Sequence, residues 1–150
     1  MRVVPYDFDS NASFEIAESN LGRVDYDGKP PRIFRDPAAL RALEKLAAAL
    51  RDEGYNIDIP RPGKACQAGC SCLLAPDRKI DILLFVSDRT QDSLQCFVST
   101  FYSQPFMYRL LRRDLLASPQ FLEVWKNLCG AIDKGLRHTL AASSVKWGRL

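Results

Sequence analysis

Six of the seven residues from 80 to 86 are apolar, and this run constrains the fold more than any other part of the chain. It is too short for a typical helix, and turn-forming residues border it on both sides. We therefore expect a central β-strand that is buried on both faces. Residues 94–102 follow after a polar loop and are rich in β-branched and aromatic side chains, which favours a second strand. Together the two segments predict the core of an antiparallel meander.

Residues 37–53 carry the signals of an amphipathic helix. Asp36 is a good N-cap residue, and Pro37 suits the first helical position because its missing N–H would have no intrahelical partner there. Leucines and alanines then recur at spacings of three and four, which is typical of a helix with one buried face. Gly54 is expected to end the helix as a C-cap glycine.

Two further helices are expected late in the chain. Residues 105–117 follow polar residues that can cap a helix. Ser118 and Pro119 then repeat the combination of cap and proline seen at the first helix. From position 121 to position 140 one apolar stripe continues over about five turns, which predicts a long helix with one buried face.

Short alternating segments predict the remaining strands. The expected short strands are residues 13–17, 23–26, 56–59 and 145–147, and a further strand is expected to begin at residues 72–74. The first two flank a turn at residues 20–22, which favours an N-terminal hairpin. Residues 60–63 read Pro-Arg-Pro-Gly and are expected to break the strand before them.

The order of these elements predicts an α+β fold: an antiparallel meander with one early helix and two late helices packed on it. The chain has 150 residues and no internal repeat, which fits a single domain over residues 1–150. No run approaches the roughly 18 apolar residues of a membrane helix, and the start lacks the apolar stretch of a secretory signal. We therefore expect a cytoplasmic protein that does not enter a membrane.

Cysteines form the most unusual local pattern. They are Cys66, Cys70, Cys72, Cys96 and Cys129. The first three could bring sulfur ligands to one Zn²⁺, with Cys96, Cys129 or His138 as the fourth ligand, but the second ligand pair of a structural zinc site is absent. We therefore expect reduced thiols or a labile disulfide and no metal, with zinc as the alternative. In an extended segment Cys70 and Cys72 point to the same face, so core packing explains both.

The sequence contains few residues that indicate catalysis. His138 is the only histidine, and we expect it on the exposed face of the last helix. Neither a GxxxxGK loop followed by Ser or Thr nor a GxGxxG loop occurs, so no phosphate-binding motif is present. We therefore expect a protein without catalytic residues or a cofactor. A thiol or metal enzyme centred on the cysteine group is the alternative.

Acidic residues gather early in the chain. Between positions 7 and 27, six carboxylates stand against a single arginine, Arg23. They are Asp7, Asp9, Glu15, Glu18, Asp25 and Asp27. A solvated edge of the domain explains such a run. The other interpretation is an acidic surface that meets a basic partner.

A nucleic-acid-binding regulator is a further alternative. Its basic residues would be Arg109, Arg112, Arg113, Lys126, Lys134 and Arg137, with aromatic residues nearby in the sequence. Such residues can bind nucleic acid by phosphate contact and stacking. Because acidic residues interrupt the cluster and the net charge is only +3, we do not expect nucleic acid as the partner.

Several features occur together over residues 36–150. They are a leucine-striped helix that ends at Gly54-Tyr55, an Asn-Ile-Asp-Ile strand, a Pro-Arg-Pro-Gly break, a two-strand meander, and late helices before Val145-Lys146-Trp147. This organisation resembles the small single-domain immunity proteins encoded beside bacterial polymorphic and contact-dependent growth-inhibition toxins. Because such proteins act by occlusion, the resemblance implies a cognate toxin domain as the partner and no catalytic residues.

Nuclease toxins are basic around their nucleic-acid cleft, so the acidic N-terminal surface is the interface that we expect to cover it. The expected partner-binding residues are Tyr6, Asp7, Asp9, Glu15, Asp25, Tyr26 and Asp27, with the tyrosines as aromatic anchors. Charge reversal at Asp25 and Asp27 is therefore expected to weaken binding at low salt.

Overall fold

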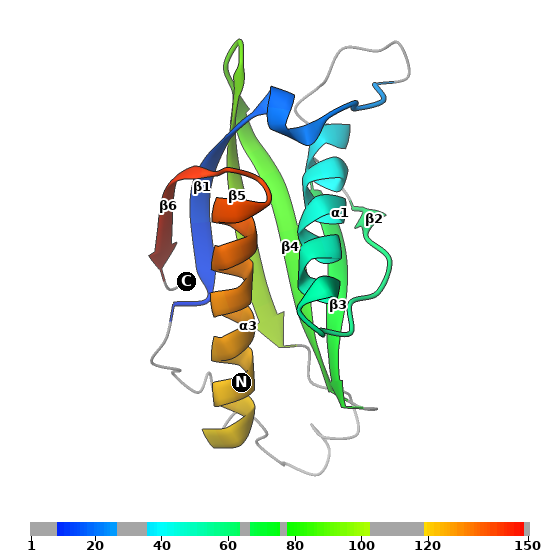
Figure 1. The fold of residues 1–150 in the computed structure, drawn as a ribbon, viewed down its shortest axis with the longest axis vertical. Coiled ribbons are helices and arrows are strands. Elements are labelled where there is room, and N and C mark those ends of the chain that lie inside the picture. The colour runs from blue at the N-terminus through cyan, green and yellow to red at the C-terminus, as the bar shows by residue number, and fades with distance from the viewer. Residues whose placement is uncertain (1–8, 27–35, 64–66, 76–77, 103–118, 149–150) are drawn as a thin grey trace.

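One antiparallel sheet organises the protein (Figure 1). The computed structural model describes residues 9–26, 36–63, 67–75, 78–102 and 119–148. Six strands lie in the order β2-β3-β4-β5-β1-β6, and every neighbouring pair is antiparallel. Their bounds are β1 Asn11–Ala17, β2 Arg61–Pro62, β3 Gln67–Ala75, β4 Arg78–Arg89, β5 Ser93–Tyr102 and β6 Ser143–Gly148. The predicted α+β class and the central meander are therefore confirmed.

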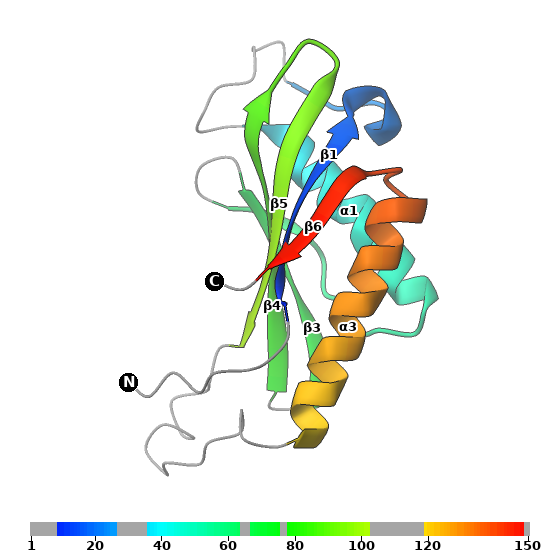
Figure 2. The same cartoon turned by 90° about the vertical axis from the view of Figure 1, so that its left-hand side faces the viewer.

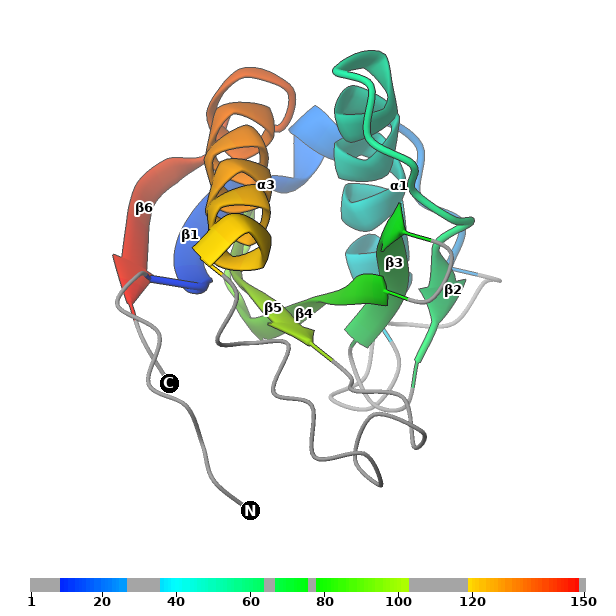
Figure 3. The same ribbon diagram turned by 90° about the horizontal axis from the view of Figure 1, so that it is seen from below.

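Two helices, α1 Pro37–Asp52 and α3 Pro119–His138, lie side by side on one face of the sheet (Figure 3). The predicted start of α1 is confirmed, because the Asp36 carboxylate accepts a hydrogen bond from the backbone N–H of Ala38 at 3.0 Å. Gly54 follows the helix at a φ of +95°, a conformation that favours glycine. The predicted helix at 105–117 and the Ser118 cap lie outside the described residues. No described helix is long and apolar enough to cross a membrane.

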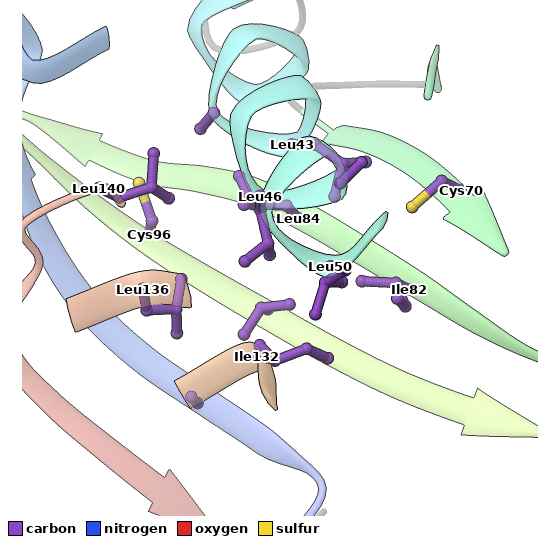
Figure 4. Close-up of a cluster of buried hydrophobic side chains, with 14 of the residues drawn as sticks. Leu43, Leu46, Leu50, Cys70, Ile82, Leu84, Cys96, Ile132, Leu136 and Leu140 are labelled. Atoms are coloured by element: carbon purple, nitrogen blue, oxygen red, sulfur yellow. The ribbon is translucent and has the colours of Figure 1, made fainter. Parts of the chain in front are cut away.

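The core lies between this helix pair and the sheet (Figure 4). Leu43, Leu46 and Leu50 of α1 are buried and meet apolar side chains of the sheet and of α3. The two helices approach closely at Gly135, where an added Cβ would lie 2.7 Å from Cδ1 of Leu46. A glycine at this position therefore permits the helix contact.

A buried polar contact also joins α3 to the sheet. The indole Nε1 of Trp125 donates to the Thr100 hydroxyl at 2.8 Å, and that hydroxyl donates to the backbone oxygen of Ser10 at 2.9 Å. Because all three residues are buried, each hydrogen bond satisfies a group that water cannot reach.

The predicted N-terminal hairpin is wrong. β1 pairs with β5 and β6, which are distant in the sequence, and not with residues 23–26. The short helix η1, Glu18–Leu21, follows β1, and residues 22–26 form no strand. Alternation identifies the face that a strand buries, but it does not identify the strand's partner.

Four smaller predictions about the meander also need correction. Residues 56–59 form no strand but a single bridge between Ile57 and Cys72, made by backbone hydrogen bonds of Asn56 and Asp58 with β3. The expected break contains β2, which pairs with β3, and β3 begins at Gln67 rather than near residue 72. β4 is not buried on both faces, because its burial alternates along the strand. Apolar side chains on both faces of β4 had concealed that alternation in the sequence.

Candidate functional site

The face of the sheet opposite the helices carries an apolar cluster. The buried positions of β4 and β5 face the helices, so the alternate positions point the other way. We call this side of the sheet the open face, because neither α1 nor α3 covers it, and we define the aromatic ridge as Leu83, Phe85, Phe97 and Phe101 on it. Phe85 and Phe97 are paired across the strands, and their rings stack with centroids 5.2 Å apart. Phe97 is 39% exposed.

Short side chains flank the ridge on the neighbouring strands. On β1, Ser13 lies opposite Phe97. On β3, Gly69 lies opposite Leu83, and an added Cβ there would stand 3.0 Å from Cδ2 of Leu83. Gly69 therefore leaves room for Leu83 to lie towards β3. Among the described elements, both long helices lie on the other face (Figure 2), so neither α1 nor α3 covers the ridge.

One end of the sheet is rich in carboxylates. We define the acidic end by its charged residues in the described chain, which are Glu15, Glu18, Arg23, Asp25, Asp36, Arg41, Glu44, Asp88, Arg89 and Asp92. Seven carboxylates thus stand against three guanidiniums. The strand register places Asp88 and Glu15 on either side of Gln95. A backbone hydrogen bond from Glu18 to the oxygen of Asp92, 3.1 Å long, ties η1 to the tip of the β4–β5 hairpin.

Arg89 organises the interior of the acidic end. Its Nη1 lies 2.7 Å from Glu18 Oε2, and its Nη2 lies 2.7 Å from Asp36 Oδ2. Nη2 also donates to the Tyr26 hydroxyl at 3.1 Å, and the Tyr26 hydroxyl donates to Glu18. The hydrogen bond from Tyr26, with a smaller contribution from Arg89, holds the pKa of Glu18 below its usual value.

The structure gathers only part of the predicted partner-binding set. Tyr6, Asp7 and Asp27 lie outside the described residues. The other four residues are Asp9, Glu15, Asp25 and Tyr26, of which the last three lie at the acidic end. Asp9 precedes β1 at the other end of that strand, about 20 Å away at the usual rise per residue.

Glu15 and Tyr26 are also held by neighbouring side chains of the protein. Glu15 accepts hydrogen bonds from the Ser93 hydroxyl and, at 3.0 Å, from the Gln95 side chain. Tyr26 belongs to the Arg89 cluster. Sequence reasoning missed Asp88 and Asp92, which join the acidic end through strand pairing. Both residues lie in the polar loop that the sequence predicts after residue 86. Only the pairing of β1 with β5 shows that this loop lies beside the early carboxylates.

The described cysteines are core residues. Cys70, Cys72, Cys96 and Cys129 are buried free thiols. As expected, Cys70 and Cys72 share the buried face of β3. Burial raises the pKa of Cys70 and Cys96 to about 12, and that of Cys72 and Cys129 to about 11. Cys66 lies outside the described residues, which contain no group of three or more side chains arranged to hold a metal.

The basic residues of the nucleic-acid alternative are only partly described. Arg109, Arg112 and Arg113 lie outside the described residues. On α3, Lys126 and His138 are exposed, as expected for His138. The other two basic residues of that helix have acidic partners: Arg137 pairs with Asp133 at 3.0 Å, and Lys134 pairs with Glu53 at 2.9 Å. These pairs reduce the positive field that a phosphate backbone would meet.

Comparison with protein-family models, curated proteins and solved structures gave no match. We therefore infer the function from the arrangement of the chain's own residues.

Proposed function

We propose that this chain is a non-catalytic binding protein that neutralises a cognate bacterial toxin domain of the nuclease class by covering its active site. One observation carries the proposal: the aromatic ridge and the acidic end adjoin on the open face. Glu15 belongs to the acidic end, and it lies one row along β1 from Ser13, the residue opposite Phe97. An apolar centre beside charged residues is the usual composition of a protein interface.

The two surfaces would contribute in different ways. Stacked aromatic side chains supply large, rigid contact area, and such residues dominate the binding energy of many interfaces. Carboxylates at the acidic end would attract a basic partner and set its orientation, which affects the association rate more than the final affinity. A nuclease cleft fits this surface because it must be basic to hold phosphates.

The chemistry of the described thiols supports a binding role over the thiol-enzyme alternative. A cysteine nucleophile needs a thiolate at working pH and access to its substrate. Burial keeps Cys70, Cys72, Cys96 and Cys129 in their neutral form and away from solvent. In the proposed binding protein these cysteines therefore have a structural role in the core.

A nuclease assay tests the proposed function. The proposal predicts a toxin domain encoded next to this chain, and that domain is incubated with nucleic acid while the full chain is added in increasing amounts. We expect inhibition that is complete near one equivalent, and no hydrolysis by the chain alone. Full nuclease activity in an excess of chain would contradict the proposal.

A pair of variants locates the inhibitory surface in the same assay. Phe97→Ser removes the centre of the ridge, and Val124→Ser is the matched control because Val124 is 41% exposed on α3, in the helix layer. Phe97→Ser should weaken inhibition by at least about tenfold, since interface aromatics often contribute more than 1.4 kcal/mol. Equal inhibition by the two variants would exclude the ridge as the binding surface.

A further inference from the structure

Arg89 contacts three separate segments of the acidic end. From the end of β4 its guanidinium pairs with Glu18 of η1 at 2.7 Å. It pairs with Asp36, the N-cap of α1, through both carboxylate oxygens at 2.8 and 2.7 Å. It also donates to the Tyr26 hydroxyl at 3.1 Å, and its Cζ lies 5.6 Å from the centre of the Tyr26 ring. One side chain therefore connects the hairpin tip, residues 18–26 and the start of α1.

Arg89 partly neutralises the two carboxylates of this cluster. Glu18 and Asp36 are two carboxylates that share one guanidinium. The Asp36 side chain is only 5% exposed, and the Arg89 side chain is 23% exposed. Loss of the guanidinium would leave two like charges facing each other, with Asp36 poorly hydrated. Separation of the segments would relieve that repulsion.

The two ends of residues 18–26 differ in their other attachments. η1 keeps the backbone bond from Glu18 to Asp92, and the Leu21 oxygen accepts from Nε of Arg41 at 3.0 Å. Asn20 of η1 also donates to the Leu140 oxygen at 3.3 Å. Tyr26, five residues after η1, is attached through the cluster of Arg89 and Glu18. Within residues 22–26, Val24 is partly buried against the core, so the end of the segment at Tyr26 is the part of this region that depends most directly on Arg89.

We propose that Arg89 acts as a latch, which holds residues 22–26 against the start of α1 and whose release opens this segment while the sheet and α3 stay folded. Local opening of this kind is common where few buried contacts hold a segment, and in residues 22–26 the apolar contact with the core comes from the half-buried side chain of Val24. The role of the latch in binding rests on the proposed function: in the closed form Asp25 and Tyr26, two of the expected partner-binding residues, lie at the acidic end. The latch can be tested in the free protein, without a partner.

Hydroxyl-radical footprinting of the full chain, without a partner, tests the latch. The oxidation rate of Tyr26 reports the exposure of the segment, and that of Trp125, which is 1% exposed, reports the core. In Arg89→Met we expect the Tyr26 rate to rise several-fold and the Trp125 rate to stay unchanged. Arg137→Met is the matched control, because it removes an arginine whose carboxylate partner, Asp133, lies on its own helix.

A second variant, Glu18→Gln, tests the latch even if Arg89→Met does not fold. This substitution keeps the shape of the side chain and removes one charge of the latch, so Tyr26 should become more reactive, though less than in Arg89→Met. An unchanged Tyr26 rate in both variants would overturn the proposal. A joint rise of the Tyr26 and Trp125 rates would also overturn it, since the cluster would then hold the whole fold. Because no toxin is present, this result is independent of the nuclease assay.

Discussion

At the scale of single residues, the buried hydroxyl of Thr100 links α3 to the residue that precedes β1. It accepts from the indole of Trp125 and donates to the backbone of Ser10. Thr100→Val keeps the volume and removes both bonds, so we expect a loss of roughly 1–3 kcal/mol in the free energy of unfolding. Ser99→Val, one residue away on the open face, is the control for strand propensity. Chemical denaturation measures both, and equal stability of the two variants would contradict this assignment.

The buried thiols make a second prediction at this scale. In a Cys66→Ser background the native protein at neutral pH should not react with a thiol reagent, whereas the unfolded chain should react at four positions. Because burial raises these pKa values from 9.0 to about 11 or 12, the thiols stabilise the fold fully below about pH 9. That contribution disappears as the pH rises through 11 to 12. Labelling of any cysteine in the native state would be inconsistent with the packing.

At the scale of elements, two glycines of α3 should respond oppositely to the same change. An added Cβ at Gly130 meets no atom within 4 Å, so Gly130→Ala should stabilise by up to about 1 kcal/mol through helix propensity. An added Cβ at Gly135 would lie 2.7 Å from Leu46, so Gly135→Ala should destabilise by about 1–2 kcal/mol. Thermal unfolding compares them. A Gly135→Ala variant as stable as Gly130→Ala would show that the helices do not pack this closely.

The helices and the strands differ in how far the sequence predicts them. The helices were predictable because their signals are local: Asp36, Pro37 and the leucine spacing act within a few residues. The partner of β1 was not, because β5 begins more than 70 residues later and alternation does not encode pairing. The acidic end shares that limitation. Its early carboxylates were visible as a run, but Asp88 and Asp92 join them only through the sheet.

At the scale of the whole molecule, the acidic end should govern the rate of association. The double variant Asp25→Lys with Asp92→Lys should slow association with the toxin domain at low salt, and the difference from wild type should shrink as salt screens the charges. Glu123→Lys is the control, because Glu123 is an exposed carboxylate on α3. Stopped-flow mixing at several salt concentrations measures the rates. Identical rates for the double variant and the control would remove the acidic end from the interface.

The position of the partner is the central claim, and photo-crosslinking tests it most directly. A photoreactive phenylalanine analogue is placed at Phe97 on the open face in one protein and at Val124 in the helix layer in another, since the two native side chains are similarly exposed. Each full chain is mixed with the toxin domain and illuminated. We expect a one-to-one crosslinked product from position 97 and little from position 124. A product from position 124 alone would contradict this expectation and would place the partner on the helices.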